Sequence, residues 1–100
     1  MVQEAGRALA RAARSPARVI VFGSWGRGDP RPDSDLDFLV VERVVDSRLE
    51  EMVCLRDALP PLGVPVDVLV ATEEHVREWG DVRGTMVNAA LSEGRVLVES

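Results

Sequence analysis

The sequence lacks lysine altogether and contains a single cysteine, and both shortages exclude kinds of chemistry. All 12 basic residues are arginine, which rules out a Walker-type phosphate loop and a Schiff-base mechanism, because both require a lysine. Cys54 alone permits no intrachain disulfide and no cysteine metal cluster. We expect Cys54 to be a small helix residue without a redox role.

Long apolar runs are also missing, since no stretch approaches the roughly 18 residues of a membrane span. The arginine-rich N-terminus has some likeness to a transit peptide, but its apolar spacing favours a structural helix, so the cytoplasm is the expected compartment. The net charge of −5 argues against a general nucleic-acid binder or a protein of anionic membranes. It does not exclude a triphosphate ligand held by metal ions and local arginines.

The residues that are present describe one small globular domain. With 46% hydrophobic and 29% charged residues, the 100-residue chain has enough apolar material for a single core. Apolar periodicity predicts helices over residues 2–14, 47–59, 73–79 and 81–91, and strands over residues 19–22, 35–41, 64–71 and 95–99. This order of elements predicts a compact α/β or α+β domain.

Two helix starts carry capping signals. Ser47-Arg48-Leu49-Glu50 matches a capping box, and Thr72 can cap a helix whose first turn is acidic. Gly80 and Gly94 are expected to end the two later helices. The apolar stripe of the 47–59 helix is expected to consist of Leu49, Met52, Val53 and Leu59.

The stretch from Val19 to Val40 carries the chemistry, because VIVFGSWGRGDPRPDSDLDFLV places a glycine-rich turn between two strands. Asp35 and Asp37 are two residues apart on the second strand, so their side chains share a face with Cα atoms about 6.5–7 Å apart. Such a pair repels itself unless cations or protons neutralise it. A carboxylate pair that can hold Mg²⁺, facing a turn that can hold phosphate, indicates chemistry on a nucleoside triphosphate.

A third carboxylate, Asp67, interrupts the apolar run VPVDVLVA over residues 64–71. Burying a charge among valines is costly without partners. If the second and third strands are neighbours, Asp35, Asp37 and Asp67 meet at one end of the sheet. The alternative, that the three are turn caps and exposed carboxylates, is less favoured.

Gly23-Ser24, ten further residues, Asp35-x-Asp37 and then Asp67 resemble the signature of the DNA polymerase beta-like nucleotidyltransferase superfamily. The short length is similar to that of its minimal members, the MNT proteins, and the motifs span residues 19–71. The resemblance implies a polymerase beta-like core of the α/β (α+β) class, with a small mixed β-sheet flanked by helices. It also implies one minimal nucleotidyltransferase domain over residues 1–100.

The resemblance assigns roles to five residues. Gly23 and Ser24 would hold the triphosphate through backbone N–H groups and a hydroxyl, at the start of a short helix. Asp35 and Asp37 would ligate two Mg²⁺ ions. Asp67 would complete one metal site and help deprotonate the attacking hydroxyl.

Four other side chains have plainer interpretations beside a role in the site. Arg27 matches a basic residue of the family's turn and would neutralise phosphate, with a surface arginine as the alternative. Trp25 departs from the small or basic residue expected at its position, and either stacks on a nucleobase or packs the turn. Trp79 is expected in the core or at an interface, and His75 on a helix surface.

The implied function is Mg²⁺-dependent transfer of a nucleoside monophosphate, AMP foremost, from ATP or another NTP to a hydroxyl. The sequence leaves no segment for an acceptor domain, so the acceptor surface is expected on a partner protein. In the resembled family that partner is commonly a helical HEPN toxin, with the MNT protein as antitoxin. Two alternatives stay open, an aminoglycoside-type small-molecule nucleotidyltransferase and a non-catalytic binding module. The sequence also leaves open the base preference and whether the chain self-associates as a homo-oligomer.

Overall fold

A computed structural model describes residues 2–14, 16–28, 31 and 34–99, and most of the predicted loop over residues 28–33 lies outside them. Its four strands are β1 (Ala17–Phe22), β2 (Leu36–Glu42), β3 (Val66–Thr72) and β4 (Arg95–Val98). They form one sheet in the order β3-β2-β1-β4. β1 pairs antiparallel with β2 and with β4, whereas β2 pairs parallel with β3. The mixed sheet and the adjacency of the second and third strands confirm the sequence-based predictions.

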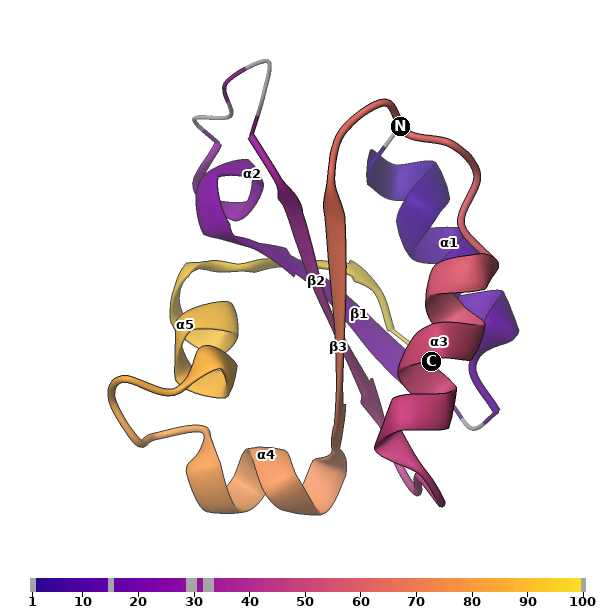
Figure 1. Cartoon of the computed structure of the whole chain (residues 1–100). Coiled ribbons are helices and arrows are strands. Elements are labelled where there is room, and N and C mark those ends of the chain that lie inside the picture. The colour runs from indigo at the N-terminus through magenta and orange to yellow at the C-terminus, as the bar shows by residue number, and fades with distance from the viewer. Residues whose placement is uncertain (1, 15, 29–30, 32–33, 100) are drawn as a thin grey trace.

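Helices cover both faces of this sheet (Figure 1). α1 (Val2–Ala12) and α3 (Arg48–Asp57) lie on one face, and α4 (Glu73–Trp79) and α5 (Met86–Glu93) lie on the other. The short helix α2 (Gly23–Arg27) lies at the end of the sheet where β1 finishes and β2 begins. None of the helices that the structure describes is long and apolar enough to cross a bilayer.

β2 is buried on both of its faces, as its nearly continuous apolar sequence predicts. Leu36, Phe38 and Val40 belong to the core cluster beneath α1 and α3. Leu39 and Val41 belong to the cluster on the opposite face, with Ala90 of α5. Successive side chains along β2 therefore point to opposite faces of the sheet, and Asp37 lies on the same face as Leu39 and Val41.

The predicted helix caps are present. The Ser47 hydroxyl accepts a hydrogen bond from the Glu50 N–H at 3.3 Å, and the Thr72 hydroxyl accepts one from the His75 N–H at 3.1 Å. Gly80 and Gly94 follow α4 and α5 as C-caps. Local capping chemistry therefore places these ends correctly.

Two predictions about helices are wrong in detail. The predicted stripe of α3 fails at Leu49 and Val53, which are 71% and 53% exposed, because α3 turns Glu51 and Leu55 toward the core instead. The last helix begins at Met86 and not at residue 81, because the Thr85 hydroxyl caps it by accepting the Asn88 N–H at 3.1 Å.

The buried Glu51 ties α3 to the end of α1. One carboxylate oxygen accepts the backbone N–H of Arg14 at 3.2 Å, and the other lies 3.4 Å from the Arg14 Nε. Only 4% of the Glu51 side chain is exposed, against 64% for Arg14. The carboxylate is therefore held at a nearly dry site by a partner that reaches it from the surface.

We expect Glu51→Ala to lower the free energy of unfolding by about 1–3 kcal/mol, because a partly buried N–H loses its acceptor. Glu51→Gln keeps an acceptor oxygen for the Arg14 N–H and should cost less. Urea denaturation of both variants measures the difference, with Glu50→Ala as the exposed control on the same helix. Equal stability of Glu51→Ala and Glu50→Ala would contradict a role for this contact.

Candidate active site

β1 runs directly into a glycine turn. After Phe22, Gly23 has a φ of 71°, a left-handed conformation that glycine adopts without strain. α2 begins at Gly23, and its first N–H groups have no partners within the helix because they precede the first turn. Gly28 ends the helix with a φ of 84° and donates its N–H to the Ser24 carbonyl. The short helix expected after the first strand is therefore present and begins at Gly23.

Asp37 and Asp67 are direct neighbours across the sheet. In the parallel ladder of β2 and β3, Asp37 pairs with Asp67, and each is the second residue of its strand. In the antiparallel ladder of β1 and β2, Asp37 pairs with Phe22, the residue before Gly23. The register therefore puts the turn and both carboxylates at one end of three adjacent strands.

The Asp37 carboxylate lies directly over the Cα of Gly23. A Cβ built on Gly23 would come within 2.7 Å of the Asp37 Oδ2. Real Cβ atoms essentially never show so short a contact, so any side chain at this position would displace the carboxylate. Gly23 therefore meets two requirements at once, a positive φ and a close approach to Asp37.

The local electrostatics are unfavourable to charge on Asp37. Its pKa is raised above the ordinary value of 3.8, first by burial and then by the negative charges of Asp67 and Asp35. Asp35 precedes β2 and is exposed, so it is not the first strand residue that the sequence predicted. Asp35 nevertheless lies near enough to act on Asp37, so all three predicted carboxylates share one neighbourhood.

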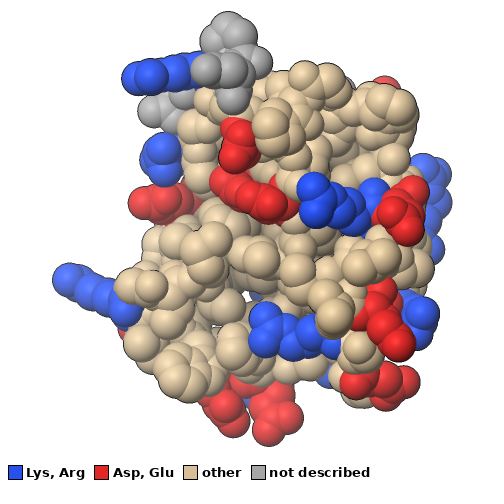
Figure 2. Space-filling view, viewed as in Figure 1, with Lys and Arg blue, Asp and Glu red and all other residues tan. Residues whose placement is uncertain are grey.

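The ligand type of the three carboxylates suits a hard cation such as Mg²⁺. Among the residues that the structure describes, no group of three His, Cys, Asp or Glu side chains is placed to hold a metal ion at once. Carboxylate oxygens are the ligands that Mg²⁺ prefers, and mutual repulsion of the kind felt by Asp37 is relieved by a cation. Figure 2 shows acidic side chains gathered over the starts of β2 and β3. Asp37 and Asp67 therefore form the base of a candidate Mg²⁺ site, with Asp35 beside it.

Arg27 and Trp25 both lie on α2. The Arg27 guanidinium forms an exposed ion pair with Glu93 of α5 at 3.2 Å, which holds it to that helix. Trp25 donates its indole N–H to the Ser34 carbonyl at 3.3 Å, and its ring packs against the core. Packing of the turn is therefore the role that the structure gives Trp25, whereas phosphate neutralisation by Arg27 stays a prediction.

A pocket that was not predicted from the sequence lies on the face that carries Asp37 and Asp67. It has a volume of about 300 Å³ and lies between β3, α4 and α5. Leu39 and Leu69 line it, each two residues beyond one of the carboxylates, together with His75 and Trp79. Two sequence signals could have indicated this surface: Leu39 and Leu69 each follow a carboxylate by two residues on a strand, and His75 and Trp79 are four residues apart on a helix.

Comparison with known proteins gives concordant results. Residues 4–97 match the family model described as "Nucleotidyltransferase domain". A protein of Methanocaldococcus jannaschii, provisionally named a protein adenylyltransferase, is 32% identical over 80 residues, which cover 80% of this chain and 76% of that protein.

Two solved structures share the fold. A crystal structure of a toxin–antitoxin with AMP-PNP contains a chain with a TM-score of 0.63 and 20% identity, matched over 100% of this chain and 75% of that one. A provisionally named nucleotidyltransferase from Sulfolobus solfataricus gives a TM-score of 0.66 at 19% identity, over 98% of this chain and 77% of that one. At these identities the likeness to the two structures concerns the fold.

Proposed function

Because the chain belongs to the nucleotidyltransferase domain family, we propose that it transfers AMP from ATP to a hydroxyl group of a partner protein in the presence of Mg²⁺. The observation that carries this proposal is the Asp37–Asp67 pair beside the Gly23–Ser24 turn. The pair offers oxygen ligands, the turn offers backbone N–H groups, and the two lie at the same end of the sheet.

The turn would bind the leaving part of the nucleotide. The N–H groups at the start of α2 and the Ser24 hydroxyl would donate hydrogen bonds to the β- and γ-phosphate oxygens. The Arg27 guanidinium, three residues further on, would add positive charge near the same oxygens. These contacts would orient the α-phosphorus toward Asp37 and Asp67 and stabilise the pyrophosphate as it leaves.

Asp37 and Asp67, with Asp35 beside them, would hold Mg²⁺, which when bound neutralises the charge that builds on the phosphate oxygens. Asp67 would accept the proton of the acceptor hydroxyl. The hydroxyl oxygen forms a bond to the α-phosphorus, the bond between the α- and β-phosphates breaks, and pyrophosphate leaves with that electron pair. The products are therefore the phosphodiester on the acceptor, pyrophosphate, and one proton on Asp67.

The acceptor is proposed to be a helical HEPN-type toxin, with this chain as its antitoxin. Support comes from the provisional name of the M. jannaschii relative, a protein adenylyltransferase, and from the toxin–antitoxin structure of similar fold. An enzyme of this kind would neutralise its partner by covalent modification, and pure occlusion would not require the carboxylates.

The test is label transfer. The purified chain is incubated with Mg²⁺ and α-labelled ATP, alone and with the product of the adjacent gene. We expect label on the partner, and none when the chain carries Asp35→Asn and Asp37→Asn together. Asp57→Asn, an exposed carboxylate on α3, is the matched control and should retain full transfer.

A tight complex without label from any of the four NTPs would contradict the proposed reaction. Neutralisation of the partner that survives the double substitution in full would contradict the catalytic account of the antitoxin role.

A further inference from the structure

An apolar pocket lies immediately beyond the carboxylates on the same face of the sheet. Its volume of about 300 Å³ is at the lower end of the roughly 300–1,000 Å³ typical of small-ligand sites. The side chains that matter here are Leu39, Leu69, Ala71, His75, Trp79 and Met86. Figure 2 shows this hollow below the acidic patch, in the region that Figure 1 places between β3, α4 and α5.

The pocket continues the proposed active site along two strands. Leu39 follows Asp37 by two residues on β2, and Leu69 follows Asp67 by two residues on β3. The two side chains of each pair therefore share a face of the sheet, with their Cα atoms about 6.6 Å apart. A nucleotide whose α-phosphate lies at Asp37 and Asp67 extends its ribose and base away from its other phosphates. The Gly23–Ser24 turn lies at the end of β1, across β2 from β3. The pocket lies further along β2 and β3 than the carboxylates and on the same face, so a base that extends along these strands from the α-phosphate would reach it.

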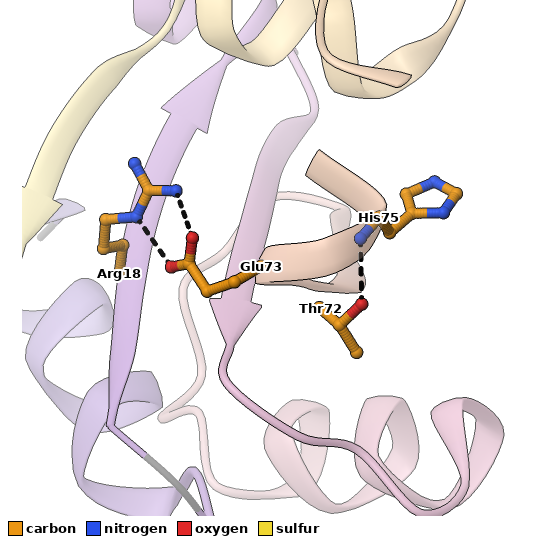
Figure 3. Close-up of polar contacts among 4 residues, drawn as sticks. All are labelled: Arg18, Thr72, Glu73 and His75. Carbon is orange, nitrogen blue, oxygen red and sulfur yellow. Dashed lines mark hydrogen bonds and ion pairs between the residues drawn. The ribbon is translucent and has the colours of Figure 1, made fainter. Parts of the chain in front are cut away.

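The wall of the pocket is held in place by polar contacts. Arg18 of β1 forms two hydrogen bonds with Glu73 at 3.1 and 3.2 Å, and Thr72 caps the same helix, α4 (Figure 3). The His75 ring points away from the Arg18–Glu73 pair. His75 and Trp79 stack with ring centroids 6.1 Å apart and planes inclined by 25°. The aromatic pair is thus presented by a helix anchored to the sheet.

We propose that this pocket binds the nucleobase of the NTP, an inference that rests on the proposed function. Apolar floor residues and an aromatic wall suit a flat heterocycle, and aromatic stacking does not depend on the identity of the base. The Thr85 hydroxyl, which also lines the pocket, donates to the Val82 carbonyl at 2.8 Å and accepts the Asn88 N–H. Because that hydroxyl is already engaged, the pocket would hold a base mainly by contact area and stacking, and the polar groups of Arg48 and His75 also line it.

The test compares ligands with and without a base. Calorimetry in Mg²⁺ measures the binding of a nonhydrolysable ATP analogue, its GTP counterpart and inorganic tripolyphosphate. We expect both nucleotides to bind more tightly than tripolyphosphate. Trp79→Ala and Met86→Ala should each weaken nucleotide binding, Trp79→Ala by at least about fivefold, and leave tripolyphosphate binding unchanged. Trp79→Phe should restore most of the loss because it keeps a ring.

Trp79 and Met86 are 44% and 56% exposed, so their substitution should leave the fold intact, which circular dichroism checks. Leu49→Ala, on the opposite helical layer, is the matched control and should change neither affinity. Unchanged nucleotide affinity in Trp79→Ala and Met86→Ala, with tripolyphosphate still bound, would overturn the base pocket alone. A loss of transfer to the partner at saturating ATP, without loss of nucleotide affinity, would overturn it in favour of an acceptor site. Failure of nucleotide and tripolyphosphate alike to bind would overturn the proposed function together with it.

Discussion

Asp37→Asn should lower the rate of nucleotidyl transfer by about a thousandfold or more, because it removes several kcal/mol of transition-state stabilisation. Asp37 is the carboxylate that pairs with Asp67 across the ladder and also lies against the Gly23 turn, so Asn at this position removes the negative charge at the centre of the proposed site. Single-turnover label transfer at saturating ATP measures the effect. Transfer within about tenfold of wild type would exclude Asp37 from the reacting site.

The same substitution should raise the stability of the free protein at neutral pH. Burial, Asp67 and Asp35 raise the pKa of Asp37, so the folded state binds its proton more tightly than the unfolded state does. Ionised Asp37 therefore destabilises the fold at pH values above its folded pKa, and this cost disappears as the pH falls through that pKa toward 3.8. The neutral amide introduced by Asp37→Asn carries no such cost.

Urea denaturation without metal, from pH 7 to pH 4, should consequently show a stability advantage of Asp37→Asn that shrinks on acidification. A variant that is less stable than wild type at pH 7 would contradict the strain assigned to this carboxylate.

Gly23→Ala should reduce transfer by about a hundredfold, because its new Cβ would push against the Asp37 carboxylate, and displacement of a reacting group by about 1 Å can cost that much. The φ of 71° should also cost about 1–2 kcal/mol of stability for any residue with a Cβ. Transfer rates at saturating ATP and urea denaturation measure the two effects separately.

Gly63→Ala provides the matched control. Gly63 has a φ of 77°, but a Cβ built there has nothing within 4 Å. Both variants should therefore pay a similar backbone cost in stability, and only Gly23→Ala should lose activity. Equal activity in the two variants would show that the close approach of Gly23 to Asp37 is not needed for transfer.

Local sequence signals predicted much of this fold. Ser47 and Thr72 cap their helices as their spacing to the following N–H donors indicated, and the apolar run of β2 correctly predicted a strand covered on both faces. These features depend on a few consecutive residues, so a sequence can specify them without knowledge of the tertiary structure. The family prediction rested on the same kind of signal, and the match over residues 4–97 confirms it.

The wrong predictions concern features that depend on more than the local apolar pattern. Leu49 and Val53 were expected to be buried, but α3 turns Glu51 inward because Arg14, 37 residues away in sequence, supplies the partners of its carboxylate. The start of α5 at Met86 depends on a cap at Thr85 that competes with the apolar pattern beginning at residue 81.

The sequence by itself determined the chemical groups of the site: a glycine turn after one strand, Asp35 and Asp37 at the next, and Asp67 on a third. Tertiary structure alone decided that Asp37 pairs with Asp67 in register and that Gly23 lies against the Asp37 carboxylate. It also decided that His75 and Trp79 face a pocket beside the same carboxylates. Strand alternation and capping act over a few residues, whereas register and close approach depend on how strands far apart in sequence pack together.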